Sequence, residues 1–404
     1  MTAPSTNVAK EVDAGSGAGL FARAPVTDKF EVQGRFDQDR LNELLLWSME
    51  RKASDVTIQT NEVIRAEIGG VLYPIVKRQV NQSELEDIIR YIYGENGVAE
   101  LKMGHDIDCA HEVKIKDVGR IRYRVNITGV RARLGISGYS ITLRALPQQP
   151  PRMADLGIEE AIISAWRPKN GMILVTGPTG SGKSTLLASG IRHLFERGES
   201  EKILEYSAPV EYTYDGLVPD HCLISQSSLP QHLRPKSGEE SWFAYSARNA
   251  LRRKPSTIIV GEARDRETIS ACIELALTGH LVYSTMHTIG VAETIRRAIR
   301  AFETEDQRTA AFDMMDTLRM VVTQRLLPRV GGGLVASREF MVFDNKARAR
   351  FLDTESVEEW PTLARQMMVE KRCVAQTMEE SAGNLLEQDL ITMDTFRFEA
   401  ARKS

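Results

Sequence analysis

The chain has 404 residues, 42% of them hydrophobic and 26% charged, which is ordinary for a globular protein of two or three domains. Its 52 lysines and arginines and 55 aspartates and glutamates leave a formal net charge of −3, which gives no support to a broad nucleic-acid-binding role. The four cysteines form no C-x-x-C pair, so the sequence predicts neither a zinc site nor a disulfide framework.

Residues 1–35 are rich in alanine, serine, threonine and glycine without periodicity, so we expect a mobile tail. They lack the apolar stretch of a secretory signal, and no part of the chain is apolar over the length that a bilayer requires. The sequence therefore predicts a cytoplasmic protein that meets a membrane through a partner or a surface patch.

Residues 36–146 have the pattern of a compact α+β domain. Amphipathic spacing predicts helices over 37–54 and 83–102, the second opening with a capping box from Ser83 to Glu86. Alternating apolar residues predict six strands, over 55–59, 63–68, 71–75, 109–115, 119–129 and 137–145. A proline-rich run follows, and because proline cannot continue a strand ladder we expect a linker over 147–153.

From residue 154 to 404 strands alternate with helices, which predicts a mostly parallel sheet wrapped by helices. The expected strands are 172–176, 202–206, 257–261 and 281–285, and the expected helices are 184–196, 241–253, 266–277 and 291–301. A further amphipathic helix is predicted over 306–327. After a glycine break at 331–333 we expect two short strands and then helices over 356–404.

Residues 172–186 contain a motif for nucleoside triphosphates. A buried strand is predicted to end before a segment that matches G-x-x-x-x-G-K-[ST], and a helix to follow it. The glycines let backbone N–H groups face phosphates, Lys183 can reach the β- and γ-phosphates, and the Ser184 hydroxyl can bind Mg²⁺. The predicted phosphate-binding residues are Gly177, Pro178, Thr179, Gly180, Ser181, Gly182, Lys183, Ser184 and Thr185.

Carboxylates stand at the ends of two other predicted strands. Glu262 ends a buried run, where an NTP hydrolase needs an acid to hold Mg²⁺ or to orient water. Gly261 stands where an aspartate often does, so Glu262 is predicted to act alone. Glu205 and Glu211 flank the exit of another strand, and we favour Glu211 as the second carboxylate, with Glu205 as the alternative.

Histidines and arginines complete the candidate site. His280 and His287 flank one predicted strand, and we favour His287 as the residue that senses the γ-phosphate. Arg120, Arg122 and Arg124 share one face of another strand, because side chains alternate with a period of two. Two interpretations of these arginines remain: they form a solvated face, or they contact nucleotide phosphates across a domain or subunit boundary.

In their order along the chain, these motifs resemble the PilT/GspE/VirB11-like secretion ATPases. The phosphate loop is followed by an acidic box at 207–211, a Walker B stretch at 258–265 and a His box at 278–288. Segments of the first domain look like the PAS-like domain of that family, at 53–58, 65–70, 121–126 and 143–147. The resemblance covers about residues 40–400 and implies an α/β fold in which a PAS-like domain precedes a RecA-like ATPase domain.

The resemblance also implies a homohexamer that binds ATP and Mg²⁺ between the two domains. By position, Glu262 would be the catalytic carboxylate, Glu211 the acidic-box glutamate, His287 the His-box residue, and Arg122 and Arg144 the arginines that face nucleotide. The implied partners are inner-membrane components of a secretion or conjugation machine. They would hold the ring at the inner membrane, without direct nucleic-acid binding.

Two departures from the family pattern narrow these expectations. Ser207-Ala208 replaces the usual Glu-Asp pair, which removes one carboxylate and leaves a nucleotide-gated scaffold with little hydrolysis as an alternative. The retraction-type motif is degraded at 347–352, which argues against the other alternative, a pilus retraction motor. Segments at 226–240, 248–253 and 261–265 are most similar to the type IVB branch, so we expect an ATPase for type IVB secretion or conjugal transfer.

Overall fold

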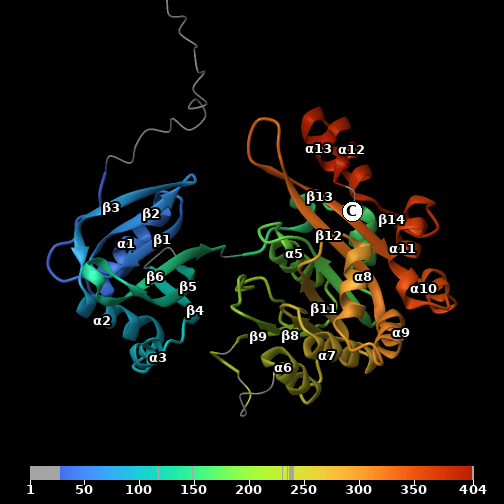
Figure 1. Cartoon of the computed structure of the whole chain (residues 1–404), viewed down its shortest axis with the longest axis horizontal. Helices are drawn as coiled ribbons and strands as arrows, with labels where there is room; N and C mark the ends of the chain where they lie inside the picture. Colours follow the sequence, from blue (N-terminus) through green and yellow to red (C-terminus); the bar gives the residue numbers. More distant parts are fainter. Residues whose placement is uncertain are drawn as a thin grey trace, which may run out of the picture.

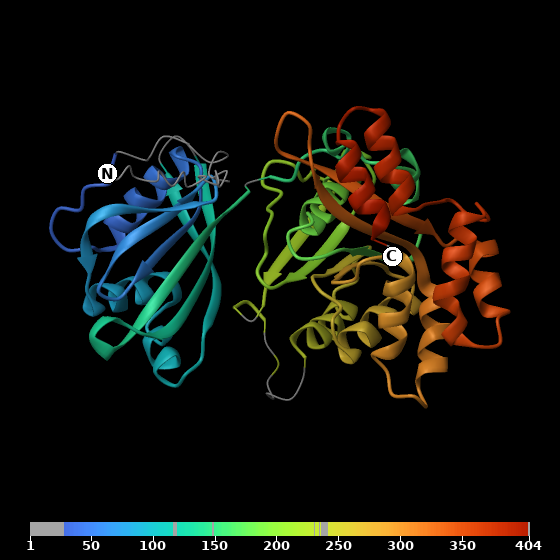
Figure 2. The same ribbon diagram turned by 45° about the horizontal axis from the view of Figure 1, so that its top comes forward.

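The computed structural model describes residues 28–115, 119–147, 149–229, 231–233, 235 and 241–402. Most of the predicted tail and part of the 226–240 segment lie outside the described residues. Two bodies lie side by side, a smaller one built from the first third of the chain and a larger one built from the rest (Figure 1; Figure 2). Each body has a sheet and a hydrophobic core of its own.

The smaller body is a six-stranded antiparallel sheet with helices against one face (Figure 1). Odd-numbered residues of the long strand β5, such as Tyr123 and Val125, enter the core, so the even-numbered arginines lie on the opposite face. The strand order is β3-β2-β1-β6-β5-β4. The elements are α1 Gln38–Glu50, β1 Ala53–Gln59, β2 Glu62–Ile68, β3 Val71–Val80, α2 Gln82–Tyr93, α3 Gly97–Lys102, β4 Ile107–Ile115, β5 Gly119–Arg131, η1 Arg133–Gly135 and β6 Ser137–Leu146.

Two details of the predicted helices in this body are wrong. The segment 83–102 forms two helices, because the chain turns at Gly94, whose φ of 116° is open mainly to glycine. The capping box is formed by Asn81 and Glu84, not by Ser83 and Glu86. Glu84 also accepts hydrogen bonds from Arg78 and from the backbone N–H of Phe36, which lowers the pKa of its carboxyl against the effect of burial.

The larger body contains an eight-stranded sheet in the order β14-β13-β12-β7-β11-β10-β8-β9. The strands from β12 to β9 run parallel, and β13 and β14 add antiparallel pairings at one edge. The first elements are η2 Met153–Leu156, α4 Glu160–Ala165, β7 Gly171–Thr176, α5 Lys183–Glu196, β8 Lys202–Ser207, β9 Leu223–Ser228, α6 Trp242–Leu251, β10 Thr257–Val260, α7 Arg266–Leu277 and β11 Leu281–Met286. The remaining elements are α8 Val291–Arg300, α9 Gln307–Thr317, β12 Leu318–Pro328, β13 Leu334–Val342, α10 Asn345–Leu352, η3 Val357–Glu359, α11 Trp360–Val369, β14 Ala375–Gln376, α12 Met378–Glu387 and α13 Met393–Ala401.

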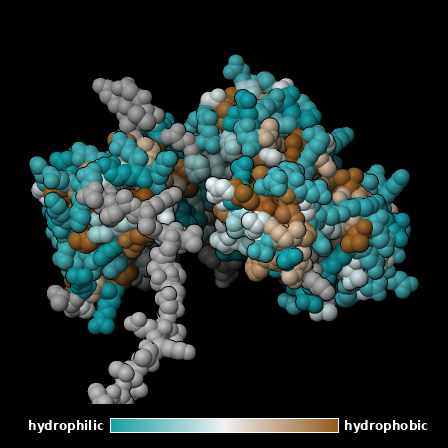
Figure 3. All heavy atoms as spheres, turned by 90° about the horizontal axis from the view of Figure 1, so that it is seen from above, coloured by the Kyte–Doolittle hydropathy of each residue, from teal (hydrophilic) through white to brown (hydrophobic). Residues whose placement is uncertain are grey.

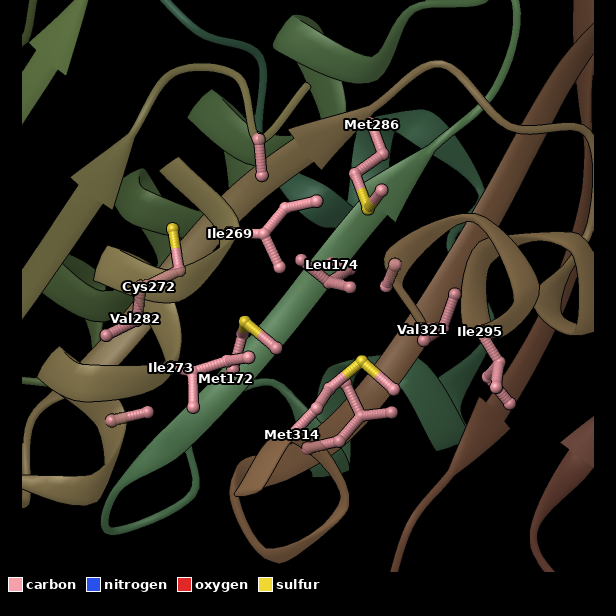
Figure 4. Close-up of a cluster of buried hydrophobic side chains, with 14 of the residues drawn as sticks. Met172, Leu174, Ile269, Cys272, Ile273, Val282, Met286, Ile295, Met314 and Val321 are labelled. Carbon is pink, nitrogen blue, oxygen red and sulfur yellow. The ribbon is translucent and has the colours of Figure 1, made fainter. Parts of the chain in front are cut away.

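The central strand β7 is buried on both faces of this sheet. Met172 and Leu174 pack with residues of α7 and α9 on one face (Figure 4). Ile173 and Val175 pack with α4 and α5 on the other face. A strand that is covered on both sides reads as a continuous apolar run, which is why the sequence located it. The phosphate-loop motif therefore follows a strand that is fixed from both faces.

The predicted helix over 306–327 is wrong in its second half. Helix α9 ends at Thr317, and the chain continues as strand β12, which pairs with β7 on one side and with β13 on the other. Val321 and Val322 fit a helical spacing, but they are β-branched and pack well on a pleated sheet. The structure also adds a strand that was not predicted, β9 at the far edge.

Within the described ranges, each helix is too short or too polar to cross a bilayer. The face seen in Figure 3 is mostly hydrophilic, with hydrophobic side chains gathered in patches over the larger body. Among the apolar residues on the surface are Val330, Leu334, Met393 and Phe398, which are 49–62% exposed.

Candidate functional site

A cleft of about 1360 Å³ lies between the two bodies and is lined by both of them. From the larger body it is lined by the phosphate loop and by the ends of β8, β10 and β11. These are the carboxyl ends of parallel strands, where open α/β sheets bind ligands. The smaller body contributes Tyr93, Asp108 and Arg124, among other residues.

The phosphate loop has the backbone conformation that its glycines predict. Gly177, Gly180 and Gly182 have φ values of 144°, 77° and 81°. A Cβ atom on Gly177 would also lie 2.3 Å from the carbonyl oxygen of Gln324, so no larger residue fits there. Helix α5 begins at Lys183, and no side chain caps its first N–H groups.

The loop fits a phosphate ligand. The uncapped N–H groups of α5 and the buried Ser181 hydroxyl, which has no hydrogen-bond partner, are groups that phosphate oxygens can satisfy. The Lys183 ammonium donates to the carbonyl oxygens of Gly177 and Pro178 at 2.8 and 2.9 Å, so it already lies over the loop. Burial lowers the pKa of Lys183, and the negative charges of Glu262 and Glu211 oppose that shift.

Glu262 lies at the end of β10 and lines the cleft. The structure also gives a reason for the glycine that precedes it. A Cβ atom at Gly261 would lie 3.0 Å from the Tyr206 carbonyl oxygen and 3.1 Å from the Ser207 Cα, so this strand end packs closely against β8. The Gly261 N–H donates to the Tyr206 carbonyl oxygen and holds the two strand ends together.

His287 lies at the end of β11, with its Nε2 atom 3.8 Å from Oε1 of Glu262. The sequence predicted both residues for the site, and the structure places them side by side in the cleft. His280 lies at the other end of the same strand. Its Nδ1 atom is 3.1 Å from both the Thr278 hydroxyl and the Leu275 carbonyl oxygen, so it packs at the end of α7, away from the cleft.

Glu211 of the acidic box and Glu205, which precedes the box, are carboxylates in different environments. Both Glu211 and Glu205 line the cleft, and Glu211 is partly exposed. Glu205 is 8% exposed and accepts hydrogen bonds from Ser207 Oγ at 2.8 Å and Gln226 Nε2 at 2.7 Å. Burial raises the pKa of the Glu205 carboxyl against the effect of these donors.

The predicted arginines occupy different environments. Arg122 is 5% exposed and donates to the carbonyl oxygens of Val210 and Glu211 at 2.7 and 3.1 Å, across the boundary between the bodies. Arg144 is exposed and pairs with Asp55 at 2.8 Å, away from the residues that line the cleft. Arg124, which lies opposite Arg144 on the neighbouring strand, is the arginine of this face that lines the cleft. The assignment of Arg122 and Arg144 to nucleotide stays a prediction.

Sequence reasoning missed Gln324 and Arg338, which lie behind the phosphate loop. Gln324 donates from Nε2 to the Ser181 carbonyl oxygen at 2.7 Å. Arg338 donates from Nε to Gln324 Oε1 at 2.8 Å. A sequence signal for these two residues existed, because each is a polar residue within a largely apolar strand. Both become buried, and they pair with each other in the sheet.

Comparisons with known proteins agree with this geometry. A family model described as "Type II/IV secretion system protein" matches residues 36–385. The type IV pilus retraction ATPase PilT of Pseudomonas aeruginosa is 30% identical over 302 residues, which are 75% of this chain and 82% of that protein.

Two solved structures support the same relationship. The ATPase DotB of Legionella pneumophila is 39% identical, with a TM-score of 0.84 over 93% of this chain and 99% of that chain. The pilus retraction motor PilT with bound ADP is 28% identical, with a TM-score of 0.74 over 89% and 96%. These matches confirm the predicted α/β fold class and the predicted family resemblance.

Proposed function

Because this chain belongs to the type II/IV secretion system protein family, whose relatives include pilus and secretion ATPases, we propose that it hydrolyses ATP to power a type IVB secretion or conjugal transfer apparatus. The observation that carries the proposal is the convergence of Lys183, Glu262 and His287 on one cleft. Nucleotide use is further supported by the relative whose structure contains ADP.

The residues of the cleft have separate roles in the proposed hydrolysis of ATP. The loop N–H groups and Lys183 bind the phosphates, and Glu262 holds and orients the attacking water through its carboxylate. His287, next to that carboxylate, contacts the γ-phosphate region and reports whether it is filled. Mg²⁺ would neutralise charge on the phosphate oxygens, and the Ser184 hydroxyl and Glu211 are the residues that would hold it. The Tyr212 hydroxyl lies 2.8 Å from Thr185 Oγ1 and positions the first turn of α5, which follows the phosphate loop.

The choice of machine rests on similarity along the whole chain. The DotB of Legionella pneumophila matches this chain more closely than PilT does, in both identity and TM-score, whereas the DotB of Yersinia pseudotuberculosis matches it about as well as PilT does. Like the ATPases of such machines, the chain would act as a homohexamer on inner-membrane partners, without contacting nucleic acid directly. It would remain in the cytoplasm and reach the membrane through these partners.

Two other functions have observations in their favour. A pilus retraction motor is favoured by the 30% identity to PilT, and it predicts loss of twitching motility with transfer intact when the gene is deleted. A nucleotide-gated scaffold is favoured by Ser207, which removes one carboxylate from the acidic box, and it predicts that ATP binding alone drives assembly.

Glu262→Gln tests the enzyme against the scaffold. The amide has the shape of the carboxylate but cannot accept a proton from water, so we expect a fall in kcat of about 10²- to 10⁴-fold with ATP still bound. Phosphate release and ATP titration measure the two effects. Lys183→Ala is the matched control, because it removes a phosphate contact and should weaken binding itself. Equal, near-zero turnover in wild type and Glu262→Gln would support the scaffold and overturn the enzyme.

A further inference from the structure

Gln324 contacts both ends of the phosphate loop from behind. Its backbone carbonyl oxygen would lie 2.3 Å from a Cβ atom on Gly177. Its side-chain Nε2 atom would lie 2.8 Å from a Cβ atom on Gly182. The same Nε2 atom donates to the Ser181 carbonyl oxygen at 2.7 Å. Gln324 is 4% exposed, so this hydrogen bond is shielded from water.

Arg338 determines which way the Gln324 amide points. The two residues lie directly opposite each other on β12 and β13, and Arg338 Nε donates to Gln324 Oε1 at 2.8 Å. An arginine can only donate and a carbonyl oxygen can only accept. The amide therefore has a single orientation that satisfies Arg338 on one side and Ser181 on the other.

Arg338 is itself held by the segment that enters the larger body. Its side chain is 2% exposed, and its terminal nitrogens donate to the carbonyl oxygens of Leu156 and Gly157 at 3.1 and 3.0 Å and to Glu159 Oε2 at 3.2 Å. Burial lowers the pKa of the Arg338 guanidinium and Glu159 opposes that shift. The arginine is thus fixed by chain that does not belong to the phosphate loop.

We infer that Gln324 is a positioning residue for the phosphate loop, oriented by Arg338. By holding the Ser181 carbonyl, it fixes the curl of the loop from Gly177 to Gly182 so that the backbone N–H groups face the phosphates. The inference rests on the proposed function, because it concerns how the same site binds nucleotide. Gln324 does not line the cleft, so it acts through the loop and not by contact with nucleotide.

Two variants of Gln324 test this. Gln324→Met has a similar length and lacks the amide, whereas Gln324→Glu can still accept from Arg338 but cannot donate to Ser181. Losing one buried hydrogen bond that shapes the loop should raise the Kd for ADP about tenfold, equivalent to about 1.4 kcal/mol. Calorimetric titration of the full chain with ADP measures this. In ATP hydrolysis KM should rise about tenfold, with kcat within threefold of wild type.

Gln376→Ala is the matched control. Its Nε2 atom donates to Glu159 Oε1 and to the Arg338 carbonyl oxygen at 3.1 and 3.0 Å, so its loss disturbs the same buried arginine without touching the loop. We expect a lower melting temperature but a Kd for ADP within twofold of wild type. Equal weakening in Gln376→Ala would overturn the inference, because the effect would then be one of general stability.

The outcomes also separate the inference from the function on which it rests. ADP affinity within twofold of wild type in both Gln324 variants would overturn the inference alone. Weakening in Gln324→Glu but not in Gln324→Met would overturn it too, since added charge would then explain the effect. If the wild-type chain bound no ADP, the proposed function and the inference would fall together.

Discussion

At the residue scale, Glu205 is a buried carboxyl group just before the altered acidic box. Ser207, which stands where the family pattern has a glutamate, donates its hydroxyl to Glu205, and Gln226 donates to the other carboxylate oxygen. Burial nevertheless dominates and raises the pKa of Glu205. The folded chain holds this proton more tightly than the unfolded chain does. The associated stability is fully present below the unfolded pKa and is lost as pH rises through the folded pKa.

Glu205→Gln should therefore change how stability depends on pH. A glutamine amide can accept from Gln226 and donate to the Ser207 oxygen without carrying a charge. The free energy of unfolding of the variant, minus that of wild type, should grow as the pH rises above the ordinary pKa of a glutamate, by at most about 1.4 kcal/mol per pH unit. Urea unfolding at several pH values measures it. Parallel curves for the two proteins would contradict the prediction.

Prediction of single site residues succeeded where one sequence motif defines both the residue types and their position in the fold. The spacing of the glycines and Lys183 defines a loop that needs no distant partner to be recognised. It failed for Gln324, which lies 143 positions from the Ser181 carbonyl that it holds. Gly261 was predicted only in part. The sequence showed that an aspartate was missing, but only the packing against Tyr206 and Ser207 explains why a glycine stands there.

At the scale of single elements, two helical glycines provide opposite tests of packing. In α12, a Cβ atom on Gly383 would lie 3.9 Å from the nearest atom, in the Phe396 ring. In α5, a Cβ atom on Gly190 would lie 2.1 Å from the Trp166 ring, which is fully buried. The same substitution therefore makes an ordinary van der Waals contact in one helix and collides with a filled core in the other.

Gly383→Ala should stabilise the protein and Gly190→Ala should destabilise it. Alanine lowers the entropy of the unfolded chain and favours the helix, so the first change should add about 0.5–1 kcal/mol. The second forces the Trp166 ring to move and should cost about 1–3 kcal/mol or more. Thermal unfolding of both variants beside wild type measures the difference. A Gly190→Ala protein as stable as wild type would mean that α5 and the ring are not closely packed.

Helix and strand prediction failed where two periodicities coincide. Across 306–327 the apolar residues Met314, Leu318, Val321 and Val322 satisfy a helical spacing, yet the helix ends at Thr317. Leu318, Val321 and Val322 are buried instead because β12 lies between β7 and β13, with neighbours on both faces of the sheet. Which alternative wins depends on strand partners far away in the sequence, and these cannot be read from the segment itself.

At the scale of the whole molecule, Arg122 connects the two bodies at the edge of the cleft. Its guanidinium pairs with Glu112 of its own sheet and donates to two carbonyl oxygens of the acidic-box loop. That loop carries Glu211, which lines the cleft, so a change in the angle between the bodies would move a candidate site residue. Arg144, whose side chain is exposed, pairs with Asp55 within the smaller body.

Arg122→Met should loosen the contact between the bodies, whereas Arg144→Met should leave it unchanged. The first variant leaves the Val210 and Glu211 carbonyl oxygens without their donor, and charge-assisted hydrogen bonds of this kind contribute about 1.5–3 kcal/mol each. The second breaks an exposed ion pair, worth about 0–1 kcal/mol.

Small-angle scattering, on variants in the same oligomeric state as wild type, should show a larger radius of gyration for Arg122→Met alone. Cleavage of the predicted linker, 147–153, by protease should also be faster in that variant. If Arg144→Met instead raised the KM for ATP while Arg122→Met did not, Arg144 would be the arginine that reaches nucleotide, and Arg122 would have only a local structural role.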